Sequence, residues 1–111
     1  MIIDFDKIKE ESVMNFKGGQ GELLTRNYVD GKCKIMKSCL RPGASSGLHR
    51  HEGNCEIVYV ISGTATFHYD GGVETASEGQ VHYCPEGHSH YMKNNTDNDL
   101  IYLAIVPEHG K

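Results

Sequence analysis

The sequence predicts an all-β domain. Segments typical of strands recur at short intervals, separated by Gly, Pro, Asn and Asp. No stretch has the long apolar periodicity of an amphipathic helix. Eight short strands in a chain of 111 residues favour a sandwich or a closed barrel. Because the reversals are so frequent, we expect the strands to pair mostly antiparallel.

The strands are expected where β-branched and aromatic residues cluster between turn residues. Their ranges are residues 21–28, 32–40, 56–61, 64–69, 73–76, 81–84, 88–94 and 100–106. Several connections contain a residue that accepts the positive φ of a tight reversal. These connections are Asp30-Gly31, Ser62-Gly63, Asp70-Gly71-Gly72 and Glu86-Gly87. Before the first strand, residues 3–13 have a weak pattern that allows a short helix.

Two of the predicted strands, residues 57–61 and 100–106, are apolar on both faces. Such strands are usually covered on both sides. In a domain of this size the core can cover only one face. A second subunit would cover the other, so a homodimer is expected; the N-terminal segment of the same chain is the alternative cover.

Composition limits the classes of protein that this chain can represent. A mass of 12.3 kDa is enough for one domain. The net charge is −4, with no concentrated basic stretch, which disfavours nucleic acid as a partner. No apolar run approaches a membrane span or a signal peptide. We therefore expect a cytoplasmic protein whose four cysteines are reduced thiols.

Histidine is the residue type that points to chemistry. Five of the seven histidines fall in two short stretches. His49 and His51 project from the same face of an extended segment, and a turn can fold Glu56 back beside them. His90, from a later strand, would add a third nitrogen. Three imidazoles and a carboxylate suit Mn, Fe, Co, Ni or Zn, whereas Ca and Mg prefer oxygen ligands.

The spacing of ten residues around these histidines resembles the paired motifs of the cupin superfamily. The positions are Gly43, His49, His51, Glu56, Gly63, Gly79, Pro85, Gly87, His90 and Asn94. The resemblance implies a double-stranded β-helix, or jelly-roll, barrel with its metal ligands at His49, His51, Glu56 and His90. It implies a single domain over residues 1–111, with a barrel core at about 39–106 and a peripheral segment at 1–20.

Next to the ligands, His82 is the candidate for a catalytic proton-transfer group. In cupins its position usually faces the barrel interior, which would point His82 toward the pocket. The opposite phase buries Val81 and Tyr83 and leaves His82 outside, and the sequence does not decide between the two. His88 shares the parity of His90, but its place directly after a turn favours exposure.

The functional expectation is a metal-dependent cupin that binds or transforms an oxygen-rich small molecule. The resemblance implies dioxygenase, decarboxylase or sugar isomerase activity without separating them. The alternative is a non-catalytic protein that binds or senses a small ligand with the help of its metal. A His82 ring beside the ion would favour catalysis, whereas a pocket with apolar walls would favour binding.

Overall fold

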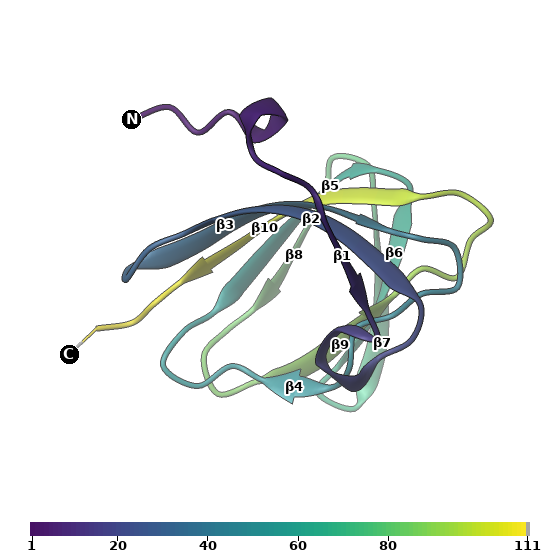
Figure 1. The fold of residues 1–111 in the computed structure, drawn as a ribbon. Coiled ribbons are helices and arrows are strands. Elements are labelled where there is room, and N and C mark those ends of the chain that lie inside the picture. Colours follow the sequence, from purple (N-terminus) through teal and green to yellow (C-terminus); the bar gives the residue numbers. More distant parts are fainter. Residues whose placement is uncertain (111) are drawn as a thin grey trace.

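The computed structural model describes residues 1–110, which form two facing antiparallel sheets (Figure 1). The larger sheet has the strand order β1-β2-β3-β10-β5-β8, and the smaller has the order β4-β9-β6-β7. The larger sheet contains β1 (Glu11–Met14), β2 (Glu22–Val29), β3 (Cys33–Leu40), β10 (Leu100–Pro107), β5 (Glu56–Ser62) and β8 (Val81–Cys84). The smaller sheet contains β4 (His49–Arg50), β9 (Ser89–Lys93), β6 (Thr64–Tyr69) and β7 (Gly72–Ser77).

All eight predicted strands are confirmed, with ends that shift by no more than one residue. Two strands were not predicted: β1 and the two-residue β4. The helix allowed over residues 3–13 is wrong, because that segment contains only the 3₁₀ turn η1 (Phe5–Lys7) before β1 begins. Val13 of β1 pairs with Leu23 and packs on the core, so tertiary pairing outweighs the weak local pattern.

The core lies between the two sheets. It includes Phe67, Leu40, Leu100, Val58 and Val60, all at most 2% exposed. Burying each of these side chains contributes roughly 1.5–3 kcal/mol to the free energy of unfolding. Strand β10 pairs with both β3 and β5, so its inward residues occupy the centre of the larger sheet.

The outer face of the larger sheet is covered unevenly. The guanidinium of Arg26, on β2, donates hydrogen bonds to the carbonyl oxygens of Phe5 and Ile8, which holds the N-terminal segment against this end of the sheet. At the other end, Tyr59 of β5 and Tyr83 of β8 are 43% and 52% exposed. The N-terminal segment therefore covers one part of the apolar outer face and leaves another part open.

Within residues 1–110, no helix has the length and apolar character needed to cross a bilayer.

Candidate metal centre

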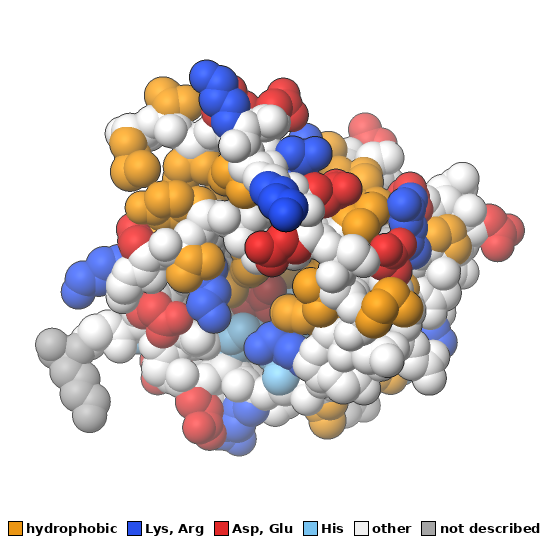
Figure 2. All heavy atoms as spheres, viewed as in Figure 1, with side chains coloured by type: hydrophobic (Ala, Val, Ile, Leu, Met, Phe, Trp, Pro, Cys, Tyr) orange, Lys and Arg blue, Asp and Glu red, His pale blue; other side chains and the backbone are white. Residues whose placement is uncertain are grey.

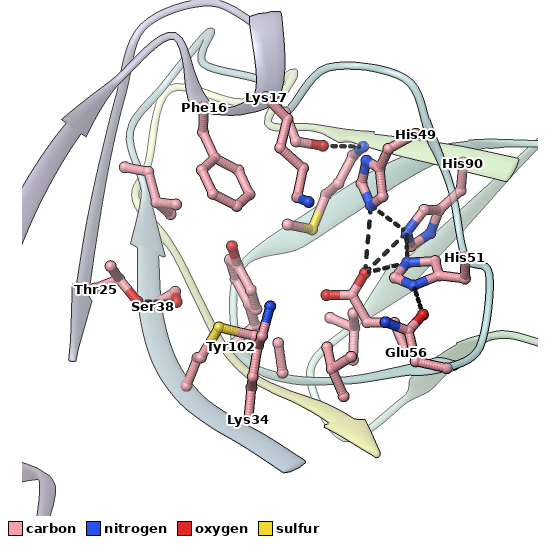
Figure 3. Close-up of a pocket in the computed structure, with 18 of the residues that line it drawn as sticks. Phe16, Lys17, Thr25, Lys34, Ser38, His49, His51, Glu56, His90 and Tyr102 are labelled. Atoms are coloured by element: carbon pink, nitrogen blue, oxygen red, sulfur yellow. Dashed lines mark hydrogen bonds and ion pairs between the residues drawn. The ribbon is translucent and has the colours of Figure 1, made fainter. Parts of the chain in front are cut away.

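The four predicted ligands converge at one end of the space between the sheets (Figure 3). His49 on β4 lies directly opposite His90 on β9 in the antiparallel register. His51 follows β4 immediately, and Glu56 begins β5. Strand pairing thus brings together residues that are up to 41 positions apart in the chain.

The distances between their donor atoms match the spacing of ligands around a single ion. The Oε1 atom of Glu56 lies 2.8 Å from the Nε2 atom of His90 and 3.2 Å from that of His51. The Nε2 atom of His90 lies 3.0 Å from that of His49 and 3.1 Å from that of His51. Metal–ligand bonds of about 2.1 Å at right angles place neighbouring ligand atoms about 3 Å apart. The cluster can therefore hold a metal ion.

Hydrogen bonds on the far side of two rings direct the free nitrogens into the cluster. The Nδ1–H group of His49 donates to the carbonyl oxygen of Gly47 at 2.8 Å. The Nδ1–H group of His51 donates to the Oδ1 atom of Asn54, also at 2.8 Å. Each ring, when neutral, then has its Nε2 lone pair free to bind an ion placed between the rings and Glu56. Converging lone pairs and a carboxylate form a site that attracts a cation, as metal-ligating histidines do.

Without a metal ion, a ring that carries a proton on Nε2 can donate a hydrogen bond to the Glu56 carboxylate, and these contacts shift the pKa values in the cluster. Burial alone would raise the pKa of Glu56, but hydrogen bonding to His49, His51 and His90 outweighs it and holds that pKa well below the usual range. The same carboxylate raises the pKa of His51. Burial is the largest influence on His90, and it lowers the pKa of that ring. Glu56 therefore remains ionised and ready to bind positive charge.

The cluster forms one wall of a cavity of about 580 Å³ between the sheets. In Figure 2, histidine side chains lie at the bottom of a hollow in this face of the molecule. The other walls are mostly apolar and come from both sheets; they include Leu23, Met36, Val58, Phe67, Met92, Ala104 and Val106. Tyr102 is also there, and burial raises the pKa of its phenol, which keeps it protonated.

Two ammonium groups enter this cavity. Lys34 lines it from β3, and Lys17 lines it from the turn η2 (Phe16–Gly18). Figure 3 shows both side chains extending into the space that the cluster faces. They place positive charge in a cavity whose walls are otherwise mostly apolar.

The backbone around Lys17 is unusual. Lys17 and Asn15 adopt φ values of 53° and 55°, in the left-handed region that is uncommon for residues other than Gly. Gly47 fits this turn closely: its N–H donates to the carbonyl oxygen of Phe16 at 2.9 Å, and a Cβ atom there would lie 1.8 Å from the carbonyl oxygen of Lys17. Part of the segment expected to be peripheral, Phe16 and Lys17, thus lines the cavity.

His82 faces the barrel interior, as one of the two predicted phases requires, and is 1% exposed. It lies behind His90, with its Nε2 atom 3.0 Å from the Nδ1 atom of His90, and is not among the residues that line the cavity. His88 lies away from the cavity as well, where its ring pairs with Asp70.

Sequence reasoning missed the two lysines. Lys34 could have been found, because residues 34, 36, 38 and 40 share one face of a strand and residue 40 is a core leucine. Lys17 had no comparable signal, since its position depends on a turn with positive φ and on close contact with a glycine far along the chain.

Comparison with known proteins finds relatives that share nearly the whole chain. The chain is 34% identical over 112 residues to an oxalate-binding protein of Thermotoga maritima, covering 96% of this chain and 93% of that protein. A crystal structure described as a predicted oxalate decarboxylase of the same organism superimposes with a TM-score of 0.90 at 32% identity, over 97% of this chain and 99% of that one.

A second relative is much longer. Oxalate decarboxylase OxdC of Bacillus subtilis is 38% identical over 74 residues, which is 62% of this chain but only 19% of that protein. The family model for the cupin domain matches residues 36–106, which include the whole predicted barrel core. With this match, the two facing sheets and the identity to relatives of the same length, the chain is a small member of the cupin family.

Proposed function

We propose that this protein binds a small carboxylate, with oxalate as the first candidate, through a divalent transition metal held by His49, His51, Glu56 and His90. The observation that carries the proposal is the convergence of these four donors on a cavity that also receives the ammonium groups of Lys17 and Lys34. The oxalate-binding relative of Thermotoga maritima supports the same ligand.

Charge balance supports a dianion in this cavity. A divalent ion neutralised in part by Glu56 retains one net positive charge, and the two lysines add two more. Four protein ligands leave two positions open around a six-coordinate ion, which suits a ligand with two oxygens. When bound, the metal supplies Lewis acidity. Lys17 and Lys34, which are exposed, attract the free end of the carboxylate by their positive charge.

The residues that line the cavity favour ligand binding over catalysis. Beyond the three ligand rings, no histidine in the described part of the chain lines the cavity. Tyr102 is held in its protonated form, and Glu52 lies at the exposed mouth, where its side chain is 77% exposed and paired with Arg50. The cavity therefore offers few groups poised to exchange a proton with a ligand.

Decarboxylation of oxalate is the second candidate, and the identity to OxdC of Bacillus subtilis is the observation that favours it. Formate and carbon dioxide released from oxalate by the metal-loaded protein would establish this candidate. Oxalate recovered unchanged from a tight complex would leave binding as the function.

Titration calorimetry with oxalate tests the proposal. The protein loaded with Mn²⁺ should bind oxalate at one site per chain, and the metal-free protein should not. Lys34→Met and Lys17→Met should each weaken binding by up to about tenfold, because each removes a positive charge that attracts the dianion. Lys32→Met, at an exposed position outside the cavity, is the matched control. Equal oxalate affinity with and without metal would contradict the proposal.

We also propose that the open part of the outer face forms a homodimer. Tyr59 and Val81 are register partners on β5 and β8, and Ile61 and Tyr83 extend the same exposed apolar patch. A second copy related by a twofold axis can cover it with the same patch.

Light scattering tests the dimer. It should give twice the chain mass for the wild type and the chain mass for Val81→Lys. Val73→Lys, an exposed valine on the other sheet, should leave the dimer intact; a monomeric wild type would refute the dimer.

A further inference from the structure

We infer that Glu74 is a positioning residue for the metal site and acts through His82 to fix the orientation and protonation of the ligand His90. The inference rests on the proposed metal site. It assigns a role to two residues outside the cavity.

The three side chains form a continuous chain of contacts that links the two sheets, since β8 belongs to the larger sheet and β7 and β9 to the smaller. The Oε2 atom of Glu74, on β7, lies 2.9 Å from the Nδ1 atom of His82, on β8. The Nε2 atom of His82 lies 3.0 Å from the Nδ1 atom of His90, on β9. The other ring nitrogen of His90 faces the ligand cluster. A path of hydrogen bonds thus runs from the surface carboxylate to the proposed metal.

The chemistry of the groups fixes the direction of each hydrogen bond. An ionised Glu74 only accepts, so the Nδ1 atom of His82 carries the hydrogen. The Nε2 atom of neutral His82 must then accept, and its partner must be the Nδ1–H group of His90. With its proton on Nδ1, His90 presents the Nε2 lone pair that a metal ligand needs. The carboxylate of Glu74 thereby selects the ligating tautomer two residues away.

Packing keeps this chain in place. The ring of Phe67 stacks on His82 with centroids 3.8 Å apart and planes 13° apart, and the planes of His82 and His90 differ by 19°. His82 and His90 are 1% and 2% exposed. The side chain of Glu74 is 52% exposed, so its charge remains hydrated and avoids the desolvation cost of a buried ion.

His90 differs in this respect from the other two ligand histidines. His49 and His51 donate to a backbone carbonyl and to a side-chain amide, which are neutral acceptors. Of the three rings, only His90 is linked through its Nδ1 atom, by way of one intervening ring, to a carboxylate. A carboxylate at the end of such a chain increases the basicity of the ligand nitrogen and restrains its ring. We therefore expect Glu74 to strengthen metal binding without touching the metal.

The test compares Glu74→Gln with Glu78→Gln, which removes an equal charge from an exposed position nearby. Co²⁺ is the reporter metal, because its visible absorption spectrum depends on the ligand field. Glu74→Gln should bind Co²⁺ about tenfold more weakly than the wild type in competition with a chelator, and its cobalt spectrum should shift. Glu78→Gln should match the wild type in both measurements.

A second variant, His82→Phe, removes the acceptor of the His90 Nδ1–H group and should weaken Co²⁺ binding further, by about 10- to 100-fold. A purely structural role for Glu74 predicts lower thermal stability of the metal-free protein with unchanged Co²⁺ affinity and spectrum. That result for Glu74→Gln would overturn the inference, as would an equal loss of affinity in Glu78→Gln. A wild type that binds no Co²⁺ would instead overturn the metal site itself, and the inference with it.

Discussion

At the scale of single residues, possible ligand atoms of His49, His51, Glu56 and His90 lie within 4.8 Å of one another. The alternation of residues along a strand does not show whether the His82 side chain points inward or outward. The alternation of residues 81–84 allows two phases, and only the packing of Phe67 on the His82 ring shows which one the chain adopts. Lys17 is the residue least accessible to sequence reasoning, because a turn and not a strand places it.

The Glu56 carboxylate should make the metal-free protein sensitive to acid. Its pKa in the folded state lies well below the value of about 4.3 expected in the unfolded chain. Its contribution to the free energy of unfolding is therefore complete above that unfolded value and is lost as the pH falls through the folded value. Urea unfolding of the metal-free protein from pH 6 to pH 3 should show this loss, and Glu56→Gln should reduce it. An identical acid dependence in the variant would show that Glu56 is not the source.

His51 gives the free energy of unfolding the opposite pH dependence. Hydrogen bonding to Glu56 raises its folded-state pKa, so its contribution is complete below the unfolded value of about 6.5 and is lost as the pH rises through the folded value. Stability of the metal-free protein should therefore decline on the alkaline side as well. Metal binding, which displaces the proton from His51, should become tighter over the same rise in pH.

The cysteines should differ sharply in reactivity. All four are unpaired in residues 1–110, as expected for reduced thiols. Cys84 is fully buried, and burial raises its pKa to about 12. Iodoacetamide at pH 8 should therefore leave Cys84 unmodified in the folded protein and modify it after denaturation, as peptide mass spectrometry can show. Rapid labelling of native Cys84 would contradict its placement in the core.

At the scale of elements, long strands with turn residues at both ends were predicted almost to the residue, because the apolar pattern and the turns agree. The elements that were missed have little sequence signal of their own. Strand β4 has two residues, and β1 becomes a strand through its pairing with β2. Both elements help to form the candidate metal site and its cavity, because β4 provides His49 and the turn after β1 provides Lys17.

Because Gly47 contacts the turn η2, we expect a side chain at this position to disturb the turn. Gly47→Ala would place a Cβ atom 1.8 Å from the carbonyl oxygen of Lys17, so the turn must move. We expect a loss of about 1–3 kcal/mol in the free energy of unfolding, typical of an overpacked contact, together with weaker oxalate binding.

Gly31→Ala is the control for this prediction, since it has ordinary φ and no atom within 4 Å of the added Cβ. Urea denaturation of both variants provides the comparison. If Gly47→Ala is as stable as Gly31→Ala and binds oxalate normally, the turn does not depend on Gly47.

At the scale of the whole molecule, the sequence predicted a single barrel and strands covered on both faces. The two facing sheets confirm the expected jelly-roll fold. The second expectation is met only in part within one chain: the N-terminal segment covers the β2 end of the outer face, whereas side chains of β5 and β8 stay exposed. Periodicity can show that a face is apolar, but it cannot show what covers it.

The barrel should not need the metal to fold, because its core residues lie between the sheets and include none of the four ligands. Loss of the metal can therefore be measured on a protein that remains folded. Elemental analysis of protein purified without added metal or chelator should find about one divalent transition metal ion per wild-type chain. His49→Ala and His90→Ala should retain little or none while keeping the circular dichroism of a β protein. A full complement of metal in either variant, or a wild type that takes up none even after dialysis against Mn²⁺, Co²⁺ or Zn²⁺, would contradict the metal centre.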